Sequence, residues 1–265
     1  MVLQPRTGIN RFRMVAAVAI GMCFLCAPHA LGQPAESTAS GDPVLTAQLD
    51  LPDTSMMESG IAPAAMVFYR KAVEELHQGK SVAAEKDACR AAQTDEKFAD
   101  ADALAATAAL AQRRFARALT EANAAVQIDP KDEKAWVILA TADNYLAQYG
   151  DALDALRHVA AEHWTTWQVA YQWARAETGL DDGAQTLDWA NRAALTAPSS
   201  FAPLHLLRAS ALLAVGDNAQ SADELEVYLQ LLNQRAPERA ELTRELKHIR
   251  ALPAQVAVVH NALEN

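Results

Sequence analysis

The chain of 265 residues is long enough to bury a sizeable core, and its composition favours helices over strands. Just over half of it is hydrophobic (51%), but only 6% is aromatic, and alanine dominates the apolar residues. Alanine has the highest helix propensity, whereas strands are enriched in β-branched and aromatic residues. The composition therefore predicts an all-α protein. The formal net charge of −10 argues against nucleic acid as a partner, because such a chain repels phosphate groups.

Residues 1–32 have the three parts of a secretory signal peptide. A basic start without acidic residues is followed by the apolar run Met14–Ala27 and then by small residues ending at Gly32. At 1.5 Å per residue this run reaches roughly 21 Å, less than the ~30 Å hydrocarbon core of a bilayer. We therefore expect cleavage between Gly32 and Gln33 and a periplasmic or secreted protein. An uncleaved segment, acting as the chain's sole membrane anchor, is the alternative.

Two of the three cysteines lie in this signal, which leaves Cys89 alone in the mature chain. One cysteine cannot form an internal disulfide, and we expect a buried, unreactive thiol on a packed helix. Residues 33–62 are rich in Pro, Ser, Thr, Gly and Asp without a lasting period, which predicts a flexible linker.

From about Pro63 onwards, small residues recur with a period of 34. One series is Ala72, Ala106, Ala140, Ala174 and, after one inserted residue, Ala209. A second series, with the same spacing and the same slip, is Ala84, Ala118, Ala152, Thr186 and Ser221, and a third is Ala91, Ala125, Val159, Ala193 and Tyr228. A shared frame in three series indicates an internal repeat, and 34 residues is the tetratricopeptide-repeat (TPR) period.

Three segments carry the resemblance to this family. The stretch 136–140 (WVILA) resembles the opening of the repeat's first helix (helix A), 149–153 (YGDAL) resembles the start of the second (helix B), and 128–130 (IDP) resembles the close of a repeat. The resemblance implies a right-handed superhelical solenoid of five helix-turn-helix repeats over 63–235. The repeats cover about 65–98, 99–132, 133–166, 167–200 and 202–235. Trp164 replaces the expected proline, and Lys71 and Arg208 stand at leucine positions.

After the fifth repeat, residues 236–252 predict one more amphipathic helix with an apolar stripe of Leu242, Leu246, Ile249 and Leu252. This helix is expected to cap the stack, and residues 253–265 to form a loose tail.

No motif for catalysis or for a cofactor occurs, so we expect no enzyme activity and no cofactor. His158 and His163 are five residues apart and would lie on different faces of a helix, which argues against a metal site. We expect Trp136 and Trp173 to fill the core. Trp164 and Trp167 lie at a repeat junction and, with Tyr171, are the candidates for a glycan- or ligand-binding surface.

In TPR proteins, certain helix-A positions face the concave surface of the solenoid. Carried over to this sequence, the resemblance gives eight candidate partner-binding residues: Tyr69, His77, Thr107, Thr141, Asn144, Tyr145, Tyr171 and Arg175. Arg175 is the only cation at these positions, which argues against a clamp for a peptide carboxylate. The sequence therefore predicts a protein-protein interaction scaffold. A membrane-anchored structural component and a glycan- or ligand-binding module are the alternatives.

Overall fold

The computed structural model describes residues 60–252, and within that range it contains eleven α-helices, one short 3₁₀-helix and no strand. The predicted signal peptide with its cleavage site, the predicted linker up to residue 59 and the predicted tail lie outside the described residues. No helix between residues 60 and 252 has both the length and the apolar character needed to cross a membrane.

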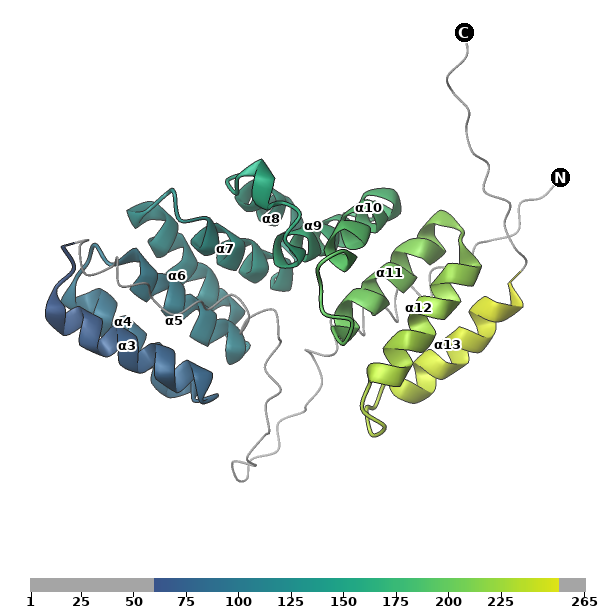
Figure 1. The fold of residues 1–265 in the computed structure, drawn as a ribbon, viewed down its shortest axis with the longest axis horizontal. Helices are drawn as coiled ribbons and strands as arrows, with labels where there is room; N and C mark the ends of the chain where they lie inside the picture. Colours follow the sequence, from purple (N-terminus) through teal and green to yellow (C-terminus); the bar gives the residue numbers. More distant parts are fainter. Residues whose placement is uncertain (1–59, 253–265) are drawn as a thin grey trace, which may run out of the picture. The chain divides into compact units, whose positions relative to one another are not determined.

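The helices follow one another in pairs that are joined by short turns (Figure 1). Their bounds are α3 Pro63–His77, α4 Ser81–Thr94, α5 Ala99–Ala111, α6 Phe115–Ile128, α7 Glu133–Tyr145, α8 Tyr149–Leu156, α9 Trp167–Gly179, α10 Gly183–Ala194, α11 Ala202–Val215, α12 Asn218–Leu231 and α13 Arg239–Ala251. The 3₁₀-helix η2, Ala161–His163, lies between α8 and α9. Five pairs and one final helix confirm the predicted all-α repeat architecture.

The 34-residue frame is visible in the helix starts and in the burial of the small residues. α5, α7 and α9 begin 34 residues apart, and α11 begins 35 residues after α9. All fifteen residues of the three series are buried, with exposed fractions of 3% or less. Small side chains at these positions let neighbouring helices approach closely, while larger residues fill the space between pairs.

The turn within each pair repeats the same backbone geometry although its residue changes. One residue per turn has a positive φ, between 59° and 90°: Gly79, Arg113, Ala147, Asp181 and Gly216. These residues keep the 34-residue spacing and the late slip. A residue in this left-handed region ends helix A and turns the chain back into helix B.

The described residues divide at Ala176 and Glu177 into two compact units, and the boundary falls within α9. In the first unit, consecutive helices pack on each other from α3 through α8, and α5 also contacts α3 and α7. Its core around α3, α4 and α5 includes Tyr69, Leu76, Phe98 and Leu104.

In the second unit, consecutive helices pack on each other from α10 through α13. α13 lies beside α12 in Figure 1 and buries Leu242, Leu246 and Ile249 against α11 and α12. The predicted capping helix is therefore present, and three of its four predicted stripe residues are buried. Leu252, the fourth, is half-buried at its end.

The departures from the family pattern have local explanations. Lys71 forms an ion pair with Asp87 at 2.5 Å, and Arg208 pairs with Glu224, so each basic residue bridges to helix B of its own pair. The third pair is uneven, because α8 has only eight residues. After α8 ends, the Trp164 indole N–H donates a 2.8 Å hydrogen bond to the Val159 carbonyl.

Candidate functional site

Four of the eight predicted partner-binding residues come together where α7 and α9 meet. We call Asn144, Tyr145, Tyr171 and Arg175 the helix-A cluster. The Arg175 guanidinium carbon lies 4.0 Å from the centre of the Tyr145 ring and 5.9 Å from that of Tyr171. The cation therefore stacks on one aromatic ring and lies near a second, an arrangement that holds its charge in place.

The cluster extends to α6 through Phe115, a residue that the sequence analysis did not select. Its ring stacks on Tyr145 with the centroids 4.5 Å apart and the planes 10° apart. Three helices, α6, α7 and α9, thus contribute to one aromatic column that includes the cation of Arg175. Because Phe115 begins helix B and not helix A, the helix-A frame could not predict it.

A buried amide pair joins the same two helices. The Asn144 side-chain NH₂ donates 3.0 Å hydrogen bonds to the backbone carbonyl and the side-chain oxygen of Gln172. Asn144 is 5% exposed and Gln172 is fully buried. In a buried site such bonds fix the position of one helix against the next, because a broken bond leaves a polar group without water. Asn144 therefore positions the cluster.

The other four predicted residues lie outside the cluster, and three of them are buried among the helices. The hydroxyls of Thr107 on α5 and Thr141 on α7 are buried and donate to the carbonyl four residues earlier. Tyr69 on α3 packs against Phe98 with the rings 4.8 Å apart. His77 is exposed at the end of α3. Of the eight, only His77 is exposed and only Tyr145 is half-buried, and binding through this set stays a prediction.

The tryptophans are largely engaged in packing. Trp173 is buried, and Trp164 meets it edge to face with the ring centres 5.7 Å apart. Trp136, expected in the core, is only half-buried. It stacks on His158 at 3.8 Å and its indole N–H donates to the Pro130 carbonyl. Trp167 is also half-buried.

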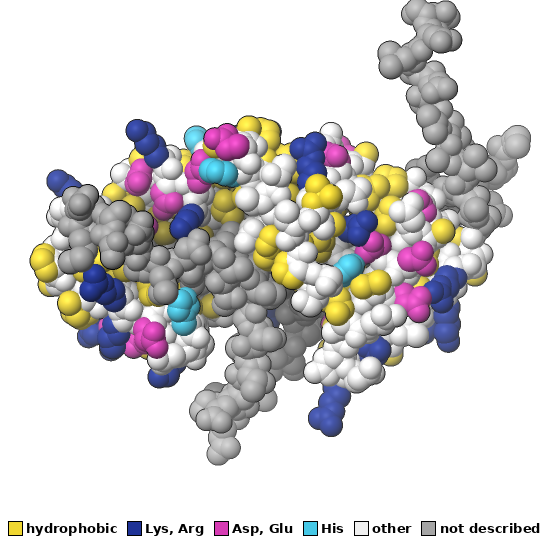
Figure 2. Space-filling view, viewed as in Figure 1, with side chains coloured by type: hydrophobic (Ala, Val, Ile, Leu, Met, Phe, Trp, Pro, Cys, Tyr) yellow, Lys and Arg dark blue, Asp and Glu magenta, His cyan; other side chains and the backbone are white. Residues whose placement is uncertain are grey.

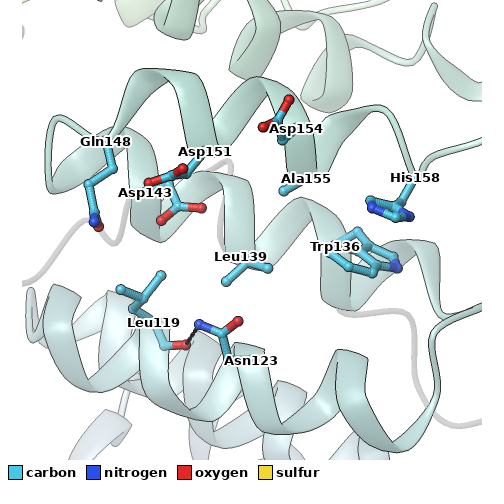
Figure 3. Close-up of a pocket in the computed structure, with 10 residues that line it drawn as sticks. All are labelled: Leu119, Asn123, Trp136, Leu139, Asp143, Gln148, Asp151, Asp154, Ala155 and His158. Atoms are coloured by element: carbon cyan, nitrogen blue, oxygen red, sulfur yellow. Dashed lines mark hydrogen bonds between the residues drawn. The ribbon is translucent and has the colours of Figure 1, made fainter.

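A pocket of about 310 Å³, which the repeat pattern did not predict, lies between α6, α7 and α8 (Figure 3). Its lining consists of Leu119, Asn123, Trp136, Leu139, Asp143, Gln148, Asp151, Asp154, Ala155 and His158. Asp143 and Asp151 point toward each other in Figure 3, from α7 and α8. Burial, together with the charge of Asp151, raises the pKa of Asp143 to about 6. A carboxylate on a helix normally lies in solvent, so no sequence pattern marked Asp143 as a site residue.

Other chemistry is sparse. Between residues 60 and 252, no group of three or more His, Cys, Asp or Glu could hold a metal ion. The His158 ring stacks on Trp136, and the His163 ring nitrogen lies 2.5 Å from a Glu133 carboxylate oxygen. Cys89 is half-buried, less than expected, and burial raises the pKa of its thiol. The face drawn in Figure 2 carries acidic and basic side chains side by side.

The chain is similar to solved structures of repeat proteins in its fold. No family model and no curated protein matches the sequence. Among solved structures, MamA from Desulfovibrio magneticus RS-1 matches with a TM-score of 0.55 and 16% identity, over 65% of this chain and 97% of MamA. YrrB, described as a TPR protein with an unusual peptide-binding site, matches with 0.53 and 13%, over 75% of this chain and 97% of YrrB. A chain of the Cut9–Hcn1 assembly matches with 0.62 and 13%, over 93% of this chain and 49% of that chain.

Proposed function

We propose that this chain, which has the TPR fold, is a non-enzymatic scaffold that binds a segment of another protein through the helix-A cluster. The observation that carries the proposal is the meeting of Tyr145, Tyr171 and Arg175 across two successive helix-A segments. Aromatic rings and arginine are the residue types that contribute most at protein interfaces. The peptide-binding site named for YrrB, which shares the fold, supports a partner of this kind.

The chemistry of the helix-A cluster indicates which kind of partner segment it can bind. It combines two tyrosine rings, an amide and a single cation, of which Tyr145 is half-buried and the other three residues are buried. An arginine that stacks on one ring and lies near a second is suited to apolar contact and to hydrogen bonding along an extended or helical segment. A peptide carboxylate would need several donors around it, and the cluster has one guanidinium.

Photo-crosslinking at a single position tests the proposal. The full chain, with Tyr145 replaced by p-benzoylphenylalanine, is produced in its own cells and irradiated. We expect a specific crosslinked protein, which mass spectrometry identifies. The matched control carries the same photoreactive residue at Val67, an exposed position on α3.

A second variant connects the crosslink to the cluster. Arg175→Gln in the Tyr145-labelled chain should reduce the crosslink while circular dichroism shows unchanged helicity. Equal crosslinking at positions 145 and 67, or no loss on Arg175→Gln, would contradict binding through the cluster.

We further propose that the protein is exported to the periplasm or secreted. The basic start, the short apolar run and the small residues up to Gly32 support this location. Mass measurement of the protein purified from its own cells tests it, because cleavage predicts a chain beginning at Gln33. An intact N-terminus in the membrane fraction would favour the anchored structural component instead.

A further inference from the structure

The pocket between α6, α7 and α8 contains a buried carboxylate without a counter-charge. Asp143 is 4% exposed, and no hydrogen bond or ion pair involves its side chain within the described residues. The charge that acts on it is that of Asp151, which carries the same sign. A buried charge is normally paired, because its transfer out of water is otherwise costly. Asp143 therefore lacks the positively charged partner that a buried carboxylate normally has.

The other lining residues do not supply this partner. Asp154 is already paired with Arg157 on the exposed side of α8. His158 stacks on Trp136, with the two rings 7° from parallel. The Asn123 amide donates to the Leu119 carbonyl, as Figure 3 shows. The pocket thus carries net negative charge around Asp143 and Asp151.

The shape and the remaining walls fit a side chain with an aliphatic stem. Leu119, Leu139 and Ala155 line the space beside the two carboxylates (Figure 3). Asp151 and His158 are exposed, so the pocket is open to solvent along α8. Its volume of about 310 Å³ is at the lower end of the range for small-molecule sites, roughly 300–1,000 Å³. A single side chain of a partner suits this space better than a large ligand.

We propose that this pocket binds a lysine or arginine side chain of a partner protein, with its cationic group between the carboxylates of Asp143 and Asp151. The aliphatic stem of that side chain lies along Leu139 and Ala155. The protein source of the cation rests on the proposed scaffold function, whereas the binding of the cation does not. The site is separate from the helix-A cluster, so each can fail without the other.

The raised pKa of Asp143 is consistent with this role. A cation next to the carboxylates offsets the repulsion between them and favours the ionised form of Asp143. At neutral pH the group is mostly ionised before any ligand arrives, because its pKa is about 6.

Titration of the ¹⁵N-labelled full chain tests the pocket. The probes are N-acetyl-lysine amide and N-acetyl-arginine amide, with N-acetyl-norleucine amide as the uncharged control and spermidine as a free polyamine. NMR follows the Trp136 indole N–H and the Gly150 amide. We expect saturable shifts with a capped basic residue and none with norleucine.

Variants then locate the binding. Asp143→Asn and Asp151→Asn should each weaken affinity by about tenfold or more, since each removes a charge that faces the cation. Glu96→Gln removes one negative charge from the exposed turn before α5 and should leave affinity unchanged. Circular dichroism confirms that each variant is folded.

Three results would overturn the proposal: no saturable shift with either capped residue, equal affinity in wild type and the two aspartate variants, or binding of spermidine alone. A positive titration together with a failed crosslink at Tyr145 would retain the pocket and remove the helix-A cluster.

Discussion

At the scale of single residues, the pocket carboxylate has a measurable cost for folding. The pKa of Asp143 is about 6 in the fold, against roughly 3.9 for an exposed aspartate. Between these two values the folded state binds more protons than the unfolded state, so stability falls as the pH rises from about 4 to 6. Above about pH 7, where Asp143 is almost fully ionised, the whole penalty is present.

Asp143→Asn should therefore stabilise the protein at pH 7.5, by about 1–2 kcal/mol, because the amide carries no charge to desolvate. At pH 4 the variant and the wild type should differ little. Urea unfolding at both pH values measures this, with Glu96→Gln as the charge-matched control. An Asp143→Asn protein that is less stable at pH 7.5 would show that the carboxylate has a partner in solution.

Ala147 is a second residue with an unfavourable environment, because its backbone has a conformation that alanine rarely adopts. It has φ 59° in the turn between α7 and α8, where Gly79 and Gly216 stand in the outer pairs. A left-handed conformation costs an alanine about 1–2 kcal/mol, a cost that glycine avoids.

Ala147→Gly should raise the free energy of unfolding by about 1 kcal/mol, after the greater freedom of glycine in the unfolded chain is deducted. The reverse change, Gly216→Ala, should lower it by a similar amount. Chemical denaturation of the two variants tests both signs, and a loss of stability in Ala147→Gly would exclude strain at this turn.

At the scale of helices, α10 and α11 approach each other closely at Gly183. A Cβ atom added at Gly183 would come within 2.7 Å of the Ala214 Cβ, closer than two carbon atoms can lie without a shift of the backbone. Gly150, near the start of α8, has no atom within 4 Å of the same added carbon. Near the start of helix B in their repeats, Gly183 therefore has no room for a side chain, whereas Gly150 has.

Gly183→Ala should cost about 1–3 kcal/mol, because α10 and α11 must separate. Gly150→Ala should gain about 0.5–1 kcal/mol through helix propensity. Thermal unfolding of the pair provides the measurement. If both variants gained stability, the close approach of α10 to α11 would be wrong.

The helices themselves could be predicted from the sequence, because packing forces small residues into a fixed frame. Ala72, Ala106 and Ala140 are fully buried for this reason. The turns could not be predicted in the same way, since glycine, arginine, alanine and aspartate all occupy the left-handed position. The frame selected Tyr145 and Arg175 but not Phe115 or Asp143, because contacts of helix B and a buried charge do not follow the helix-A pattern.

At the scale of the whole molecule, the helices α3 to α8 of the first unit and α10 to α13 of the second contact mainly their neighbours in sequence. Contacts within each unit join consecutive helices, with only short skips such as α5 to α7. In such repeat proteins stability is close to a sum of local terms, so a defect at one end weakens the nearest repeats most. The final helix α13 is the place to test this, because Leu242 is fully buried against α11 and α12.

Leu242→Ala should destabilise the structure around α13 by about 2–5 kcal/mol through loss of burial and the cavity that remains. Hydrogen exchange should show the loss of protection in α11 and α12, with α3 to α6 retaining theirs. Leu104→Ala, at a buried position of α5, is the matched control and should give the reverse pattern. If either variant lowered protection equally in residues 60–176 and 177–252, the two units would unfold as one, and the local additivity expected of a repeat stack would not hold.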